Sequence, residues 1–352
     1  FTTIGTNWIY QIYEDYVYIT VRSIIFQLFS IILLFVFVRN SHDYLNYAAI
    51  TVFSAVGSNV LNFFHARKYC HIHIIFHFNW RVHLIPILIL FASNVATLIF
   101  GNSDILLLGI MKNDYIVGIY SVSSKVYGMV KTLISALLVV TIPRLAMLFG
   151  KRRFKEYKSI LFKLTDVLVI LALPASVGVF MLAKEVILII SGPHFLRAAE
   201  SLRILSLAFL FAILSWILSS CVLIPAKREK YVLNSSISSA IINIVLNIIL
   251  IPIWNENAAA ISTVSAEIIM FFMNFGYSKD LVTDVFISKR FLYNFISSII
   301  GCIGIILICI LCDISIQSII LKTFCSIILS IIIYGIILII CHNKIVLKIL
   351  HG

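Results

Sequence analysis

Ionisable and hydroxyl-bearing side chains recur at helical spacing within long apolar segments of this chain. The residues Asn94, Thr97, Gly101 and Asp104 are separated by three, four and three positions, which places them on one face of a helix. A charged group in hydrocarbon costs about 2.5 to 3.5 kcal/mol on insertion scales, so such a residue must face protein or a wet cavity. This stripe therefore predicts an internal, polar helix face that ends at an ionisable carboxyl group.

Three further apolar segments carry stripes of the same kind. In chain order they are Ser121, Ser124, Lys125, Gly128, Thr132 and Ser135; then Ser236, Ser239, Asn243 and Asn247; then Thr263, Glu267, Met270 and Asn274. Small and hydroxyl residues also hold transmembrane helices together, so packing is the simpler interpretation of the serines and of Gly128. Packing does not require a charge, and Asp104, Lys125 and Glu267 are therefore the stronger candidates for function.

The sequence offers little for catalysis or for a metal. It lacks a Gly-x-x-x-x-Gly-Lys-Ser/Thr phosphate loop, a His-Glu-x-x-His motif and a Gly-x-Ser-x-Gly motif. Five histidines lie among basic residues without nearby carboxylates and do not match zinc-ligand spacing (His65, His71, His73, His77 and His83). Cys309 and Cys312 form one Cys-x-x-Cys without a second pair. We therefore predict neither an enzyme nor a metal centre.

The composition shows which elements must position these residues. Of the 352 residues, 61% are hydrophobic and 12% charged, against about 25% charged in a soluble domain, and the mean hydropathy is +1.08. The net charge of +12 would fit a nucleic-acid binder, but the basic residues lie mostly in loops between apolar segments. The positive-inside rule explains this excess, so we expect no nucleic-acid partner.

Apolar segments of bilayer length recur along the whole chain. A hydrocarbon core of about 30 Å needs about 20 apolar residues per helix, and this window predicts about ten transmembrane helices. They cover residues 21–38, 44–64, 84–110, 117–141, 160–182, 200–224, 232–252, 258–277, 292–311 and 318–341. Pro143 and Pro252 are expected to mark helix ends, and Pro174 to break the helix that contains it. The fold class is an all-α integral membrane protein.

Charge asymmetry between loops predicts the orientation. Alternate connections and the C-terminal tail hold 16 Lys and Arg residues, whereas the opposite set holds only Arg39, Lys112, Lys184 and Arg197. The basic set should face the cytoplasm, which places the C-terminus there as well. Residues 1–20 then also lie inside, so an even number of helices is expected to precede them.

Short motifs in the same order along the chain resemble one family. They include Asn7-Trp8-Ile9-Tyr10-Gln11 with Arg22, Asn102-Ser103-Asp104, Val117-Gly118-Ile119-Tyr120-Ser121, Ile142-Pro143-Arg144-Leu145, and Asn243-Ile244-Val245-Leu246-Asn247 with Glu267. Together they resemble bacterial polysaccharide flippases of the Wzx type (O-antigen flippases), within the multidrug, oligosaccharidyl-lipid and polysaccharide exporter superfamily. The resemblance implies a two-lobe transporter of 12–14 helices from which the first four are missing here.

On this resemblance the chain divides into five parts. Residues 1–20 form a cytoplasmic interfacial connection, 21–64 the last two helices of the N-lobe, and 65–83 a basic cytoplasmic loop. Residues 84–277 form a six-helix C-lobe, and 278–352 two appended helices with a cytoplasmic tail. The appended pair, rich in Ile, Leu, Cys and Ser, is expected to be peripheral or lipid-facing.

The resemblance implies transport of an undecaprenyl-diphosphate-linked oligosaccharide across the bacterial inner membrane by alternating access, for O antigen, lipopolysaccharide or another surface polysaccharide. Lys125 is then the first candidate for the diphosphate, with Arg22 and Arg144 at the cytoplasmic mouth. Hydrogen bonds to the sugar or diphosphate are assigned to side chains in the stripes: Asn94, Ser124, Asn243 and Asn247. Asp104 or Glu267 would couple the cycle to H⁺ or Na⁺, with no cofactor. Lipid-linked oligosaccharide, membrane lipids and the polysaccharide polymerase machinery are the expected partners.

Two other functions compete with this one. A drug/cation antiporter of the same superfamily would favour an acidic, aromatic-lined cavity, and Lys125 with Lys131 argues against it. A membrane-embedded polysaccharide polymerase or glycosyltransferase would need a sizeable outer loop or a carboxylate cluster at the membrane surface, and neither is visible. A scaffold without transport would leave the four polar stripes unexplained.

Overall fold

The computed structural model describes residues 7–39, 43–69, 80–341 and 343, and the all-α prediction is confirmed. The described chain divides into two compact units, residues 1–79 and 80–352. Among the described residues, eight helices are long and apolar enough to cross a membrane, and one bent pair forms a ninth candidate. The described residues therefore form a multi-pass membrane protein.

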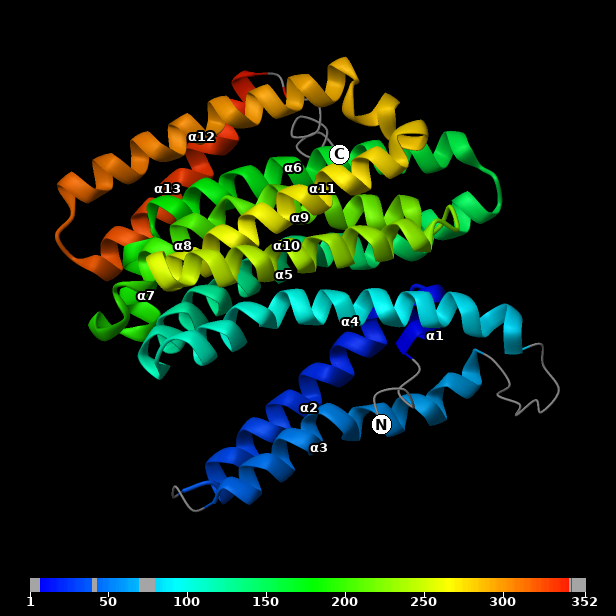
Figure 1. Cartoon of the computed structure of the whole chain (residues 1–352), viewed down its shortest axis with the longest axis horizontal. Helices are drawn as coiled ribbons and strands as arrows, with labels where there is room; N and C mark the ends of the chain where they lie inside the picture. The colour runs from blue at the N-terminus through cyan, green and yellow to red at the C-terminus, as the bar shows by residue number, and fades with distance from the viewer. Residues whose placement is uncertain (1–6, 40–42, 70–79, 342, 344–352) are drawn as a thin grey trace. The chain divides into compact units, whose positions relative to one another are not determined.

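The first unit is a helical hairpin with a short helix before it (Figure 1). Helix α1 (Asn7–Ile12) is followed by α2 (Tyr16–Phe37), α3 (Tyr44–His65) and the 3-10 turn η2 (Ala66–Lys68). The carboxylate of Asp15 accepts the backbone N–H of Tyr18 at 3.4 Å and so caps α2. Helix α2 thus begins five residues before the predicted span.

The second unit contains ten α-helices in its described part. They are α4 (Trp80–Met111), α5 (Asp114–Gly150), α6 (Phe154–Met181), α7 (Ala183–Ser191), α8 (Ala198–Ser206), α9 (Ala208–Trp216), α10 (Glu229–Trp254), α11 (Glu256–Phe286), α12 (Lys289–Ser315) and α13 (Ile319–Ile340). The 3-10 turn η3 (Pro193–Phe195) and the π-helical segment η4 (Ile217–Leu223) complete it. Each of the ten predicted spans coincides with one helix or with the α8–α9–η4 run.

Prolines interrupt this unit less than predicted. Pro174 lies inside α6, which continues to Met181, and Pro143 lies inside α5, which continues to Gly150. The predicted break at Pro174 and the predicted end at Pro143 are therefore wrong. Membrane helices tolerate proline because neighbouring helices and small adjustments satisfy the freed backbone groups. The marked bend, of 46°, lies instead between α8 and α9.

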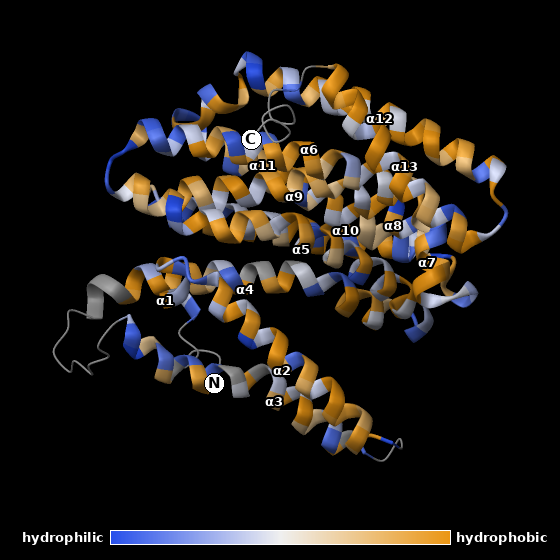
Figure 2. Cartoon of the chain, turned by 180° about the vertical axis from the view of Figure 1, so that it is seen from behind, coloured by the Kyte–Doolittle hydropathy of each residue, from blue (hydrophilic) through white to orange (hydrophobic). Residues whose placement is uncertain are grey.

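Two buried apolar clusters stabilise the second unit. One surrounds Leu202 and Phe209, and the other surrounds Leu168 and Ile217. In Figure 2 hydrophobic colours follow the lengths of the helices and hydrophilic colours gather toward their ends. This distribution is the one a bilayer requires.

The hairpin of α12 and α13 packs against α6 along one side of the second unit (Figure 1). Its outer face carries exposed Ile and Leu side chains, in agreement with the predicted lipid-facing position. Its inner face is anchored: the Tyr334 hydroxyl donates to the carbonyl of Ile170 at 2.8 Å, and Arg290 forms an ion pair with buried Asp166 at 2.8 Å.

Candidate functional site

The carboxylate of Asp104 is the centre of a buried polar network between α4, α5, α10 and α11. Its Oδ1 accepts the amide groups of Asn243 at 2.9 Å and Asn247 at 2.6 Å. Its Oδ2 accepts the hydroxyls of Tyr120 and Thr263, each at 2.5 Å. Each carboxylate oxygen of Asp104 thus accepts two hydrogen bonds, and the residue is 3% exposed.

The network extends to a second layer of hydroxyls. Ser103 donates to Oδ1 of Asn243 at 2.6 Å, and Ser262 donates to Oδ1 of Asn247 at 2.8 Å. Both asparagines thus use their amide and carbonyl groups inside the network. Because every partner belongs to the bundle, this network holds four helices together and leaves Asp104 little capacity to bind a passing ion.

A second polar group, the ion pair of Lys131 and Glu267, lies in a cavity of about 400 Å³. The Lys131 ammonium is 2.7 Å from Oε1 of Glu267, and it also lies 5.6 Å from the centre of the Tyr127 ring. The Glu267 side chain is 5% exposed and that of Lys131 is 29% exposed. The pair is therefore the accessible charged element of this cavity.

The cavity interrupts the apolar core near the middle of the helices. On α5, residues up to Val126 and Tyr127 belong to one buried cluster, and Ile134 begins the other. Lys131 lies between them, at the centre of a 37-residue helix. Glu267 occupies the same boundary on α11. Substrate sites of transporters built from such bundles lie near the bilayer midplane, and this position agrees with one.

The cavity wall is rich in hydroxyl and amide groups and includes one indole ring. Its polar and aromatic members, apart from the ion pair, are Ser93, Asn94, Ser215, Trp216, Ser219, Ser220, Ser236 and Asn274. Asn274 donates to Oγ of Ser215 at 2.9 Å and accepts from Ser235 at 2.6 Å, so its orientation is fixed. Such a wall can hydrogen-bond sugar hydroxyls or phosphate oxygens.

Ser219 and Ser220 belong to the π-helical segment η4. A π-helical turn widens the helix and often occurs at functional sites. The π-helical turn could not be predicted from residue spacing, because the sequence of Ile217–Leu223 is typical of the end of an ordinary apolar helix. Together with the bend between α8 and α9, it brings serines of a helix without a predicted polar stripe into the wall.

The other candidate residues predicted on α4 and α5 differ in whether they line the cavity. Asn94 lines the cavity with Lys131 and Glu267. Lys125 is exposed on α5, Ser124 beside it is half-buried, and Arg144 is exposed further along the helix. Among the described residues, no carboxylate lies within ion-pair distance of Lys125 or Arg144. The structure thus brings Asn94 to the ion pair and leaves Lys125 and Arg144 on the surface of the second unit.

Arg22 lies in the first unit and is 7% exposed. Within the described part of the chain, its buried Nε and Nη1 have no hydrogen-bond acceptor. A buried guanidinium without a partner is costly, so this position is suited to an anion from outside the described residues.

The tyrosines before Arg22 form a stacked aromatic cluster with His65. The Tyr10 hydroxyl donates to the carbonyl of Asn62 at 2.8 Å. His65 is therefore part of an aromatic packing cluster, and no group of three possible metal ligands occurs among the described residues. His71, His73 and His77, and the side chain of His83, lie outside the described part.

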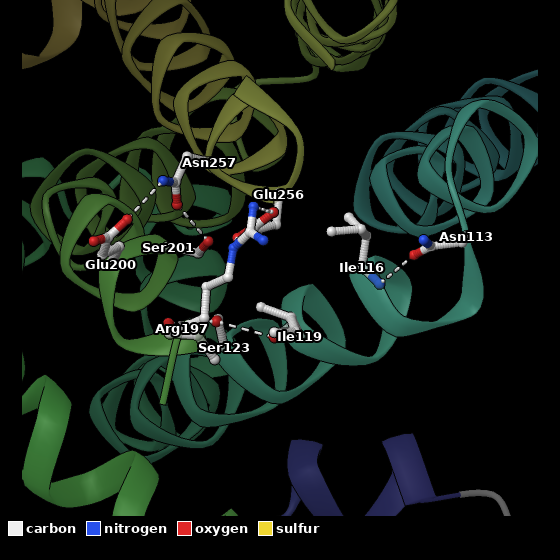
Figure 3. A network of polar contacts seen from close by, with 10 residues as sticks. Asn113, Ile116, Ile119, Ser123, Arg197, Glu200, Ser201, Glu256 and Asn257 are labelled. Atoms are coloured by element: carbon white, nitrogen blue, oxygen red, sulfur yellow. Dashed lines mark hydrogen bonds and ion pairs between the residues drawn. The ribbon is translucent and has the colours of Figure 1, made fainter. Parts of the chain in front are cut away.

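A third polar network, not anticipated from the sequence, joins α5, α8 and α11 (Figure 3). Arg197 forms an ion pair with the fully buried Glu256 at the start of α11, with Nη2 3.1 Å from Oε2. Asn257 donates to Glu200 at 3.1 Å and accepts from Ser201 at 2.8 Å. The first turn of α11 is therefore tied to the start of α8, and on α5 Ser123 donates to the carbonyl of Ala198 at 2.7 Å.

The second unit is thus a helix bundle with a polar cavity that contains a cation paired with a carboxylate, which is the arrangement expected of a membrane transporter. Residues 1–149 match the family model of polysaccharide biosynthesis proteins, and residues 90–249 match the MatE model. The predicted resemblance to the multidrug, oligosaccharidyl-lipid and polysaccharide exporter superfamily is confirmed.

A solved structure shares this fold. The lipid II flippase MurJ, in an inward closed conformation, superposes with a TM-score of 0.57 at 16% sequence identity. The match covers 83% of this chain and 62% of that one, so the chain spans less than two thirds of the length of MurJ. By sequence, no curated protein matches the chain.

Proposed function

We propose that the protein acts as a flippase that moves an undecaprenyl-diphosphate-linked oligosaccharide from the cytoplasmic to the outer leaflet of the bacterial inner membrane. A sugar and diphosphate head group cannot cross hydrocarbon, whereas the prenyl tail can remain in lipid. The observation that carries the proposal is the Lys131–Glu267 pair in a hydroxyl- and amide-lined cavity at mid-depth. Alternating access of two lobes would expose this cavity to each side in turn.

We assign the diphosphate first to Lys131, because it lines the cavity that Lys125 does not reach. Asn94, together with the serines of the wall, would hydrogen-bond the sugar. Arg22, whose Nε and Nη1 have no acceptor among the described residues, is suited to attract the diphosphate at the cytoplasmic side, and so is Arg144. Lys125 and Ser124 would contribute to binding of the head group from the exposed face of α5. In this assignment Asn243 and Asn247 act through Asp104 and do not bind sugar.

Of the two carboxylates proposed for ion coupling, Glu267 fits better than Asp104. Both oxygens of Asp104 accept hydrogen bonds from four donors, whereas Glu267 has one partly exposed cation, Lys131, as its partner. A proton on Glu267 would release Lys131 for the diphosphate, so proton and substrate would favour each other's binding. The pathway served, whether O antigen or another surface glycan, and contact with the polymerase machinery belong to the same proposal.

A drug/cation antiporter of the same superfamily is the second candidate. The match of residues 90–249 to the MatE model favours it, and so does the presence of Trp216 beside Glu267 in the cavity. An organic cation would pair with Glu267 and stack on the indole ring. Lys131 opposes this function, because a cationic ligand would have to displace it.

Complementation tests the proposal. A bacterium that lacks its polysaccharide flippase receives the full-length gene, the Lys131→Gln variant, or the control Lys155→Gln, which changes an exposed lysine. The unaltered gene and the control should restore surface glycan, and Lys131→Gln should leave lipid-linked repeat units accumulated at equal membrane abundance. Export of cationic dyes without glycan rescue in any background would instead support the antiporter.

A further inference from the structure

A second polar pocket, of about 540 Å³, lies away from the Lys131 cavity, where the α12–α13 hairpin meets α7 and α8. Six polar residues line it: Lys184, Glu185, Arg203, Asp313, Lys322 and Ser326. The connections at this end, residues 183–199 and 312–317, belong to the set that the charge pattern places outside the cytoplasm.

The charges in this pocket do not cancel. Lys322 bridges two carboxylates, at 2.7 Å from Glu185 and 2.6 Å from Asp313. Lys184 is exposed, and the Nε of Arg203 donates to the carbonyl of Phe180 at 3.3 Å, with no carboxylate at ion-pair distance from either cation in the part of the chain that the structure describes. Three cations therefore meet two carboxylates, and one positive charge remains at the pocket.

The pocket also holds an unused hydrogen-bond donor. Ser326 is fully buried and lines the pocket, and its hydroxyl has no partner among the described residues. A buried hydroxyl without a partner costs about 1 to 3 kcal/mol, so it is suited to an acceptor that arrives with a ligand. The excess cation and this hydroxyl both favour an anion with several acceptor oxygens, such as a phosphate group.

The opening of the pocket is apolar. Ile310, Ile314 and Ile319 line it with exposed fractions of 44%, 78% and 41%, and they lie at the ends of the two hairpin helices. A soluble anion gains nothing from such a rim. A phospholipid gains from both parts, because its phosphate enters the charged base while its glycerol and upper acyl chains contact the isoleucines.

We propose that this pocket binds one anionic phospholipid of the outer leaflet through its phosphodiester, whose single negative charge matches the excess cation. Lys184 and Arg203 hold the phosphate, Ser326 donates to it, and Lys322 remains paired with its two carboxylates. The bound lipid joins the hairpin to α7 and α8. This proposal does not depend on the transported substrate.

Native mass spectrometry of the full-length protein in detergent tests the proposal. The probes are phosphatidylglycerol, phosphatidylcholine with the same acyl chains, and glycerol 3-phosphate. Both lipids carry the phosphodiester, but the choline ammonium of phosphatidylcholine would add a positive charge beside Lys184 and Arg203. We therefore expect phosphatidylglycerol to bind about tenfold more tightly than phosphatidylcholine. The Lys184→Gln variant should lose most of that preference, and Lys155→Gln, at the opposite end by the charge pattern, should keep it.

The second variant, Ile314→Ser, separates a lipid site from a phosphate site. It should weaken phosphatidylglycerol binding without changing the response to glycerol 3-phosphate. Equal binding of the two lipids, or an unchanged preference in Lys184→Gln, would overturn the proposal. Competition by glycerol 3-phosphate at the concentration of the lipid would also overturn it, in favour of a soluble anion. Since Lys184 is exposed and makes no ion pair in the described structure, its substitution should not unfold the protein.

Discussion

Removal of the Glu267 carboxylate should destabilise the second unit through the loss of one ion pair. In Glu267→Gln the side-chain shape remains, but Lys131 stays in the cavity without its charged partner. Loss of one member of a buried pair costs about 3 to 5 kcal/mol. Because the Lys131 side chain is 29% exposed, we reduce this figure to about 2 kcal/mol. Such a loss corresponds to a fall of about 4 °C in the apparent melting temperature of the detergent-solubilised protein.

The pair Arg153 and Glu156 provides a matched control on the surface. It is an ion pair at i,i+3 with side chains 54% and 52% exposed, so Glu156→Gln should change stability by less than about 0.5 kcal/mol. A double-mutant cycle with Lys131→Gln and Glu267→Gln should give a coupling energy of about 1 to 2 kcal/mol. Additive effects of the two substitutions, or equal shifts in Glu267→Gln and Glu156→Gln, would refute this account of the cavity.

Three further changes test other parts of the structure. Asp104→Asn should lower the melting temperature more than Glu267→Gln does. The four donors around residue 104 would then face a neutral amide, which accepts through one oxygen and adds two N–H donors of its own. A smaller shift than that of Glu267→Gln would contradict the role of the network. Gly301→Ala should loosen the α12–α13 hairpin, because the added methyl carbon would lie 2.6 Å from the Tyr334 ring. Limited proteolysis should then cleave the variant faster in that hairpin than the unaltered protein. An unchanged cleavage rate would contradict this packing. A hydrogen bond from the Tyr69 hydroxyl, followed by the one from the Tyr18 backbone N–H, holds the pKa of Asp15 below its ordinary value. Stability from the Tyr69 contact is therefore present above the ordinary pKa and is lost as the pH falls through the lowered one. Tyr69→Phe should raise the Asp15 pKa in an NMR titration, and an unshifted midpoint would count against the contact.

The helices could be predicted from the sequence because the bilayer imposes one simple requirement on length and hydropathy. Every predicted span coincides with a helical segment, and the polar stripes of α10 and α11 do face protein. On α4 the predicted internal face holds for Asp104, which is buried, but Asn94 and Gly101 are exposed. The ends of the helices and the positions of their bends were harder to predict from the sequence. Pro174 lies in a continuous helix, whereas the bend after Ser206 and the π-helical segment η4 occur where the sequence shows only apolar residues.

The candidate site was predicted in part. Helical spacing placed Asp104, Asn243 and Asn247 on internal faces, but it could not show that the asparagines donate to that carboxylate. Gly128 lies three residues after Lys125 and three residues before Lys131, so helical spacing alone placed both lysines near one stripe, and the prediction chose Lys125. Only the packing of α9 and α11 determines that Lys131 reaches the cavity with Glu267.

The central claim is that lipid-linked oligosaccharide crosses the membrane through the cavity that holds Lys131 and Glu267. Its most direct test is flipping of a fluorescent undecaprenyl-diphosphate oligosaccharide in proteoliposomes that contain the full-length protein, with Lys131→Gln and Lys155→Gln in parallel. We predict that the unaltered protein and Lys155→Gln move the probe between leaflets, and that Lys131→Gln slows this movement at least about tenfold. Flipping by Lys131→Gln at the unaltered rate would contradict the claim.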